Sequence, residues 1–324
     1  MKKRKAFITG INGQDGSYLS EYLLENGYEV YGIVRRNSVP ENQSNRLEKF
    51  NDKLNVEYGD LLDFSCLSKN LQLIQPDEIY NLGAQSHVRI SFDIPQFTAQ
   101  TNALGVLNIL EAYRINSPKA KFYQASSSEM FGNSVDEDGF QRESTPFNPV
   151  SPYGCAKVFG YNITRNYRHS YKLHIVNGIL FNHESPRRGS NFVTNKVVKT
   201  AVQIKLGISD SLELGNMDSY RDWGHSKDYV KAMHLIINNK TPEDLVVATG
   251  VTHSVRDMTD YVFKKLDLDT KKYITQNAKY LRPQELKYLK GDSTKLREKF
   301  NWKPEYTFET LLDEMIDFWL ESYK

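Results

Sequence analysis

The segment that most clearly indicates the fold is Gly10-Ile-Asn-Gly13-Gln-Asp-Gly16. It follows the apolar run Lys5–Thr9, which has β character, and precedes a helical pattern over Ser17–Asn26. A strand, a glycine turn and a helix in this order are the context of a dinucleotide-binding fingerprint, although the glycine spacing is one residue longer than in G-x-G-x-x-G. The glycines let backbone N–H groups approach a pyrophosphate at the positive end of the helix. An ordinary strand–helix turn is the alternative, and the position directly after the first strand favours a cofactor site.

Strands and helices alternate over residues 5–181, which predicts an α/β fold with a Rossmann-type doubly wound parallel sheet. Further strands are expected at Glu29–Val34, Val56–Gly59, Asp77–Leu82, Lys121–Ala125 and His174–Phe181. Helices are expected at Phe64–Ile74, at Pro95–Arg114, after Ser151-Pro152, and at the amphipathic tail Phe308–Tyr323. We expect a cofactor-binding domain over residues 1–182, rejoined by about 225–252, and a smaller, mostly C-terminal substrate-binding domain over 183–224 and 253–324.

The composition of the 324 residues argues against several classes of protein. Lys and Arg number 42 and Asp and Glu number 40, and a net charge of +2 does not suit a general nucleic-acid or anionic-membrane surface. The two cysteines, Cys66 and Cys155, fit a reduced cytosolic protein and offer neither a disulfide framework nor a metal cluster. No apolar segment approaches the ~20 residues needed to span a bilayer. We therefore expect a soluble cytoplasmic protein without a nucleic-acid, membrane or metal partner.

The residues after the second strand favour NADP over NAD. An NAD site needs an acidic residue here for the ribose 2′-OH, whereas arginine accommodates a 2′-phosphate. Arg35-Arg36-Asn37-Ser38 follows the strand, and the next acidic residue is Glu41. The alternative is that both arginines are surface residues without a ligand. Their position after the strand, at the distance from the glycine turn expected of a cofactor site, disfavours this alternative. After the third strand Asp60-Leu61 is expected to touch adenine, and after the fourth Gly83–His87 lets the backbone pass close to the cofactor.

Tyr153 and Lys157 form the candidate catalytic pair. Residues four apart on a helix share one face, and the nearby ammonium is expected to lower the pKa of the phenol. Such a tyrosine can take a proton from a sugar hydroxyl while a hydride leaves the same carbon. Ser126-Ser-Ser-Glu129 is expected at the carboxyl end of the fifth strand, at the edge where α/β folds bind ligands. If Glu129 is a second acid/base, the enzyme is a dehydratase and not a plain dehydrogenase.

Loops after Phe181 carry several arginines, among them Arg188, Arg221 and Arg282. Arginine suits bidentate binding of a diphosphate, and a glutamate can hold ribose hydroxyls or base N–H groups. For Arg221 the alternative to binding a diphosphate is an ion pair with Asp222. Asp222 itself is not expected to bind the substrate or cofactor.

Longer strings narrow the class of enzyme. The glycine turn, the Tyr153-x-x-x-Lys157 pair and the serine-rich strand end together resemble the extended short-chain dehydrogenase/reductase superfamily. Four strings look like the GDP-mannose 4,6-dehydratase family: Ile8-Thr-Gly-Ile-Asn-Gly-Gln-Asp-Gly-Ser-Tyr-Leu19, Asn81-Leu-Gly-Ala-Gln-Ser-His-Val88, Asn177-Gly-Ile-Leu-Phe-Asn-His-Glu-Ser-Pro-Arg-Arg-Gly189 and Arg221-Asp-Trp-Gly-His225. The resemblance extends from about Lys5 to Pro304.

The resemblance implies a site residue by residue. The family's catalytic set falls on Ser127, Glu129, Tyr153 and Lys157. Its NADP contacts fall on Gly10, Asn12, Gly13, Gln14, Asp15, Gly16, Arg35, Arg36, Asn37, Ser38, Asp60, Leu61, Leu82, Gly83, Ala84, Gln85, Ser86, Tyr153, Lys157, His183 and Arg188. Its nucleotide-sugar contacts fall on Ser86, Ser126, Asn182, Asn191, Lys196, Gly215, Arg221, Arg282 and Glu285.

The implied reaction is a dehydration with internal hydride return. Tyr153, beside Lys157, would take the C4 hydroxyl proton of GDP-mannose while the C4 hydride passes to NADP. Glu129 would remove the C5 proton and protonate the departing C6 hydroxyl, and Ser127 would polarise the C4 oxygen. The hydride then returns to C6, which gives GDP-4-keto-6-deoxymannose without net oxidation. The implied protein is a lyase of nucleotide-sugar metabolism and deoxysugar biosynthesis, active as a homodimer or homotetramer.

Four departures from the family pattern bear on this expectation. Ser127 replaces the usual threonine, and Phe97 replaces a tyrosine that contacts the cofactor. Residues Asn37–Arg46 differ from a stretch that helps two subunits share a cofactor site, and an insertion usual between about Leu268 and Tyr280 is absent. The last two differences leave GDP-manno-heptose open as an alternative substrate, and leave dimer or tetramer open.

Two other classes compete with the dehydratase. A nucleotide-sugar epimerase, reductase or decarboxylase also uses a Tyr-x-x-x-Lys pair, and only its product distinguishes it. A non-catalytic NADP-binding module would keep the fold and lose the catalytic set. Because the whole set is present, we expect an enzyme.

Overall fold

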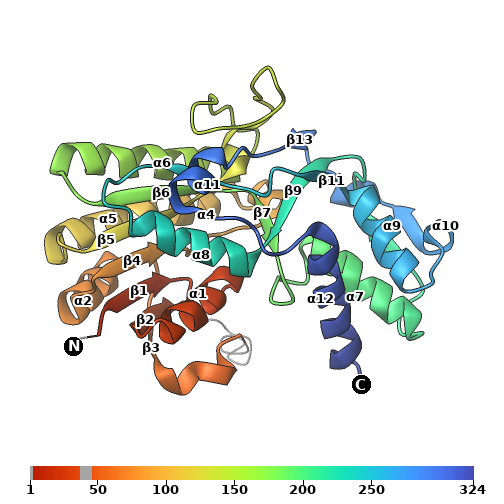
Figure 1. Cartoon of the computed structure of the whole chain (residues 1–324), viewed down its shortest axis with the longest axis horizontal. Coiled ribbons are helices and arrows are strands. Elements are labelled where there is room, and N and C mark those ends of the chain that lie inside the picture. The colour runs from red at the N-terminus through yellow and green to blue at the C-terminus, as the bar shows by residue number, and fades with distance from the viewer. Residues whose placement is uncertain (1–2, 37–45) are drawn as a thin grey trace.

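The computed structural model describes residues 3–36 and 46–324 (Figure 1). The predicted cofactor residues Asn37 and Ser38 fall outside this range, as does Glu41. No helix within it has both the length and the apolar character needed to cross a membrane. The chain begins in the main parallel sheet and ends in a helix of a second, smaller body.

Seven parallel strands form the main sheet of the described chain, in the order β10-β6-β5-β4-β1-β2-β3. They are β1 Lys5–Thr9, β2 Glu29–Val34, β3 Leu54–Tyr58, β4 Glu78–Asn81, β5 Lys121–Ser127, β6 Ile175–Leu180 and β10 Leu245–Val247. The predicted α/β fold with a parallel sheet is confirmed. The strand order reverses between β1 and β4, so their carboxyl ends flank the crevice where such sheets bind ligands. β3 starts at Leu54 and not at Val56, because Leu54 already pairs with Val30 of β2.

Helices cover both faces of this sheet (Figure 1). On one face α1 (Gln14–Glu25) and α8 (Ser226–Ile237) share a core with the strands, through residues such as Leu23 and Met233. On the other face a second core includes Leu71, Leu110 and Tyr167. These belong to α2 Phe64–Ile74, α5 Gly105–Asn116 and α6 Pro152–Tyr171.

The predicted helix over Pro95–Arg114 is interrupted. Between α4 (Pro95–Ala99) and α5 lies the π-helical segment Gln100–Leu104. Its Asn102 is buried, accepts from the backbone N–H of Gln85 at 2.8 Å and donates to the Gln85 carbonyl at 2.8 Å. The wider turn therefore places an amide where it holds the loop that follows β4.

A second body of helices and short strands starts after β6 and lies to one side of the main sheet (Figure 1). Its core contains buried Val198, Phe263 and Leu312. Its helices are α7 Val193–Lys205, α9 Val255–Lys265, α10 Thr270–Tyr273 and α12 Phe308–Ser322. Its strands are β7 Asn182–Glu184, β8 Leu212–Leu214, β9 Tyr220–His225, β11 Thr252–Ser254, β12 Ile274–Gln276 and β13 Tyr288–Leu289. α11 (Thr294–Phe300) packs back on the first core through Leu296, and the predicted domain boundaries stay a prediction.

Asp244, just before β10, connects three elements of the first body. Its carboxylate accepts two hydrogen bonds from Arg168 of α6, each 2.8 Å, and one from the backbone N–H of Asn177 of β6 at 3.0 Å. Burial alone would raise the pKa of Asp244, but the hydrogen bonds and charge of Arg168 hold that pKa below its ordinary value. The ionised carboxylate is therefore part of the folded structure.

We predict that Asp244→Asn lowers the free energy of unfolding at pH 7 by about 3 kcal/mol, because Arg168 keeps a buried charge without its main counterion. Urea denaturation measures this, with the exposed Asp210→Asn as control, expected to change by less than about 0.5 kcal/mol. Because the folded pKa lies below the unfolded value of about 3.9, the stabilisation is present above that pH. It is lost as the pH falls through the folded pKa, so the two proteins should converge in acid. Equal stability at pH 7 would contradict this role.

Candidate active site

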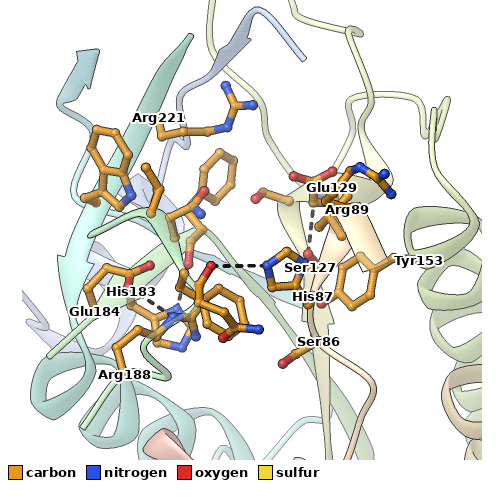
Figure 2. Close-up of a pocket in the computed structure, with 18 of the residues that line it drawn as sticks. Ser86, His87, Arg89, Ser127, Glu129, Tyr153, His183, Glu184, Arg188 and Arg221 are labelled. Atoms are coloured by element: carbon orange, nitrogen blue, oxygen red, sulfur yellow. Dashed lines mark hydrogen bonds and ion pairs between the residues drawn. The ribbon is translucent and has the colours of Figure 1, made fainter. Parts of the chain in front are cut away.

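A cavity of about 670 Å³ lies at the carboxyl ends of β4, β5 and β6, facing the second body. Figure 2 shows Ser127, Glu129 and Tyr153 on one side and Glu184, Arg188 and Arg221 across from them. The predicted site residues that line it are Asp15, Leu82, Ala84, Ser86, Ser126, Ser127, Glu129, Tyr153, Lys157, Asn182, His183, Arg188, Asn191, Lys196, Gly215, Arg221, Arg282 and Glu285. Within the described residues no cluster of His, Cys, Asp or Glu is arranged to hold a metal ion.

The glycine turn has the shape of a pyrophosphate cradle. Gly10 has φ +70°, a left-handed conformation, and a Cβ there would lie 2.9 Å from the backbone of Gly83. α1 starts after Gly13, an N-cap residue without a side chain that could accept from the first N–H groups of the helix. A glycine at this position suits the binding of a dinucleotide pyrophosphate at the helix N-terminus.

The carboxylate of Asp15 in the first turn of α1 is neutralised by His183. His183 Nε2 lies 2.8 Å from Asp15 Oδ2, and His183 Nδ1 lies 2.7 Å from the carbonyl oxygen of Phe181. Both partners accept hydrogen bonds, so both ring nitrogens carry protons. Burial opposes the charge on each side chain, but their mutual attraction raises the pKa of His183 and lowers that of Asp15. This buried ion pair connects α1 to β7 and removes a net negative charge from the cradle.

A second pair, Arg188 and Glu184, lines the same side of the cavity. Arg188 Nε lies 3.0 Å from Glu184 Oε2, and its guanidinium carbon stands 3.6 Å from the centre of the Phe192 ring. Burial raises the pKa of the Glu184 carboxyl, and the charge of Arg188 opposes that rise. Arg188 is thus held in a fixed position by charge and by stacking.

α6 delivers Tyr153 and Lys157 to the floor of the cavity. It starts at Pro152 after Ser151, whose hydroxyl accepts from the backbone N–H of Gly154 at 3.0 Å. Lys157 Nζ donates to the carbonyl of Ala125 at 2.9 Å and lies 5.7 Å from the centre of the Tyr153 ring. The two residues are adjacent, as predicted from their spacing.

The expected lowering of the Tyr153 pKa by Lys157 was wrong. Burial raises the pKa of Tyr153 to about 12, and a hydrogen bond with Ser127 only partly opposes the rise. Burial also lowers the pKa of Lys157 to about 8. The low dielectric of the site disfavours both charged forms, and this outweighs the attraction of the ammonium for a phenolate.

Glu129 lies in the 3₁₀ turn Ser128–Met130 that follows β5. The Ser127 hydroxyl accepts from the backbone N–H of Glu129 at 3.2 Å, which fixes the turn. Glu129 Oε1 accepts from Arg282 Nη1 at 3.2 Å. Glu129 Oε2 is buried and has no hydrogen-bond partner among residues 3–36 and 46–324. A carboxylate with one uncommitted oxygen in a cavity with Tyr153 is suited to accept and release a proton.

Arg221 and Arg282 place two guanidinium groups in the cavity. Burial and the charge of Arg282 lower the pKa of Arg221 to about 10. Arg221 Nη1 donates to the carbonyl of Tyr220 at 2.8 Å. The alternative ion pair between Arg221 and Asp222 is not formed; instead, Asp222 accepts from the backbone N–H groups of Thr249 at 2.9 Å and Gly250 at 2.8 Å.

Lys196 and Gly215 lie against Tyr280, a residue that the sequence did not single out. Lys196 Nζ donates to the carbonyl of Glu213 at 2.5 Å and stands 3.5 Å from the centre of the Tyr280 ring. A Cβ on Gly215 would lie 2.8 Å from the Tyr280 carbonyl oxygen, so glycine permits this close approach. Tyr280 follows directly on the segment where the family's usual insertion is absent.

Several predicted site residues are committed to internal contacts. Ser126 lines the cavity, but its hydroxyl donates to Asn177 Oδ1 at 3.0 Å. Gln14 donates from its side chain to the His183 carbonyl at 3.1 Å. The described predicted residues that do not line the cavity are Gly10, Asn12, Gly13, Gln14, Gly16, Arg35, Arg36, Asp60, Leu61, Gly83 and Gln85.

Sequence reasoning left other cavity residues unassigned. His87 ends the segment Gly83–His87 that is expected to pass close to the cofactor, and its Nε2 lies 3.3 Å from the Asn191 carbonyl oxygen. Arg89, which Figure 2 shows in the same cavity, directly follows the quoted string that ends at Val88. Glu184 lies inside the string that ends at Gly189, and its place directly after His183 and four residues before Arg188 was the available signal.

Comparisons with known proteins identify the family of this chain. A family model described as GDP-mannose 4,6 dehydratase matches residues 7–315. The GDP-mannose 4,6 dehydratase of Homo sapiens is 48% identical over 338 residues, which cover 96% of this chain and 90% of the human protein.

Two solved structures share the fold. The dTDP-glucose 4,6-dehydratase of Bacillus anthracis in complex with NAD has a TM-score of 0.85 at 21% identity, covering 98% of this chain and 97% of that one. RMD from Pseudomonas aeruginosa, complexed with NADPH, has a TM-score of 0.82 at 22% identity, covering 98% and 100%. These structures support the fold, and the family model and the human relative establish the family. The chain belongs to the GDP-mannose 4,6-dehydratase family.

Proposed function

We propose that this protein is an NADP-dependent GDP-mannose 4,6-dehydratase, a hydro-lyase that forms GDP-4-keto-6-deoxymannose. The observation that carries the proposal is the buried carboxylate of Glu129 in one cavity with Tyr153 and Lys157. Loss of water needs a group that moves a proton between C5 and the C6 hydroxyl, in addition to the Tyr–Lys pair that acts at C4. Family membership supports the same reaction.

Each catalytic residue then has one task. Tyr153 takes the proton of the C4 hydroxyl, and Ser127 donates a hydrogen bond to the C4 oxygen. Glu129 takes the C5 proton and passes it to the C6 hydroxyl, which leaves as water. When bound, the nicotinamide would accept the C4 hydride, return it to C6, and add a positive charge that favours the Tyr153 phenolate. Tyr153 gives its proton back to C5, so the substrate loses one water and nothing else.

NADP is the proposed cofactor because of the cations that follow β2. Arg35 and Arg36 are exposed there, and the guanidinium carbon of Arg35 stands 5.5 Å from the centre of the Phe97 ring. Phe97 replaces the family's tyrosine and keeps an aromatic face for this arginine. Arginine at this place favours a 2′-phosphate over a free 2′-hydroxyl.

We further propose a cytoplasmic homo-oligomer with an even number of subunits. α5 and α6 carry exposed apolar side chains, namely Ile115 at the end of α5 and Phe159 and Tyr171 on α6. Apolar residues exposed on two adjacent helices favour burial against the same helices of a second copy.

We predict that Glu129→Gln reduces formation of the 4-keto-6-deoxy product at least about 100-fold, because glutamine cannot carry the C5 proton. Mass spectrometry of the GDP-sugar after incubation with GDP-mannose measures the species that is one water lighter. Glu137→Gln, on an exposed carboxylate remote from the cavity, should leave the rate unchanged. Full dehydration by Glu129→Gln would remove Glu129 from the mechanism.

The same assay tests the substrate. Wild-type protein should remove water from GDP-mannose without net consumption of NADPH. Dehydration of GDP-manno-heptose and not of GDP-mannose would assign the longer sugar, and an unchanged mass with a new epimer would contradict the dehydratase.

We predict that Arg35→Ala weakens NADP binding about 10-fold or more and leaves NAD binding nearly unchanged, since only NADP offers a 2′-phosphate to the guanidinium. Isothermal titration with each cofactor measures the two affinities. Lys69→Ala, which removes an exposed cation from α2, is the control for a general charge effect. Equal losses for NADP and NAD would argue against a role in choosing the cofactor.

A further inference from the structure

Arg282 has two competing partners in the cavity, if the proposed function is correct. Its Nη1 lies 3.2 Å from Glu129 Oε1, the carboxylate proposed to move the C5 proton. The side chain of Arg282 is 25% exposed and that of Glu129 is 9% exposed, so the pair lies at the border between cavity and protein. The family's pattern also assigns this arginine to the nucleotide sugar, which carries a diphosphate.

A bound diphosphate would favour removal of Arg282 from Glu129. Burial lowers the pKa of Arg221, and the nearby charge of Arg282 lowers it further. Two cations that repel each other in one cavity are stabilised by an anion with two charged groups. Both guanidinium groups line the cavity. The proposed substrate supplies such an anion in its nucleotide diphosphate.

The backbone around Arg282 is fixed, so its side chain can move alone. The backbone N–H of Arg282 donates to Glu285 Oε1 at 3.0 Å. Before it, Lys279 Nζ binds Glu213 Oε2 at 2.6 Å, and after it the backbone N–H of Lys287 donates to Asn133 Oδ1 at 3.2 Å. An arginine side chain spans several rotatable bonds, and a change of rotamer transfers its guanidinium between neighbouring anions without moving the loop.

We propose that Arg282 is a substrate-released positioning residue: it pairs with the Glu129 carboxylate in the free enzyme and transfers to the substrate diphosphate on binding, so that Glu129 is free to take the C5 proton only in the complex. Loss of an adjacent cation raises the pKa of a buried carboxyl, because the ionised form loses its stabilising partner. Other charged or titratable groups that line the same cavity include Tyr153 of α6, Arg221 of β9, His87, Arg89 and Glu285.

The pH dependence of turnover tests this inference. The acid limb of kcat/KM reports the free enzyme and that of kcat reports the complex. In wild type we expect the limb of kcat to lie about one pH unit or more above that of kcat/KM. In Arg282→Gln the two limbs should coincide at the higher value, and Arg282→Lys should restore part of the separation. Lys265→Gln, which removes an exposed ion pair with Asp313, should retain the full separation.

A second measurement does not depend on turnover. Infrared difference spectra on addition of GDP to wild-type protein should show a change in a carboxylate band that is absent in Glu129→Gln and in Arg282→Gln. Coincident limbs in wild type, or a GDP spectrum without that band, would overturn the inference even if dehydration is normal. Absence of dehydration with the band present would overturn the proposed function and leave the Arg282 transfer supported.

Discussion

The hydrogen bond from the buried ammonium of Lys157 to the carbonyl of Ala125 is the contact on which the site depends. It joins α6, which carries Tyr153, to the end of β5, which carries Ser127 and leads directly into the 3₁₀ turn with Glu129. A buried ammonium is costly without an acceptor, so this bond is strongly favoured and fixes the helix against the strand. The relative positions of the phenol, the hydroxyl and the carboxylate follow from it. Dehydration chemistry requires all three at one sugar ring.

Around this contact, charge is balanced in pairs. Asp15 is matched by His183, Glu184 by Arg188 and Glu129 by Arg282. The first two pairs are internal and hold α1, β7 and the loop after it together. The third connects a proposed catalytic group to a group proposed to bind substrate, and in the proposed transfer of Arg282 this pair breaks during the cycle. Arg221 is the remaining cation in this set, and its lowered pKa reflects burial beside a second guanidinium.

The parallel sheet, and the presence of many of the predicted site residues in one cavity, could be predicted from the sequence because they depend on local patterns. The run from Lys5 to Gly16 predicted the strand, turn and helix, and the spacing of Tyr153 and Lys157 predicted their shared face. It could not predict the π-helical turn at Asn102, which depends on a contact with Gln85 far along the chain. The expected direction of the Tyr153 pKa shift was also wrong, because the burial that raises this pKa is a property of the folded state. The pairing of Glu129 with Arg282 joins residues 153 positions apart and leaves no local signal.

The central step of the proposed mechanism is the return of the hydride removed from C4 to C6 of the same sugar. GDP-mannose labelled with deuterium at C4 tests this most directly, with NMR of the product after complete conversion. We predict a 4-keto-6-deoxy sugar that carries the deuterium at C6, with no net consumption of the cofactor and no accumulation of deuterium in it. Deuterium released into the bulk cofactor, or retained at C4, would contradict it.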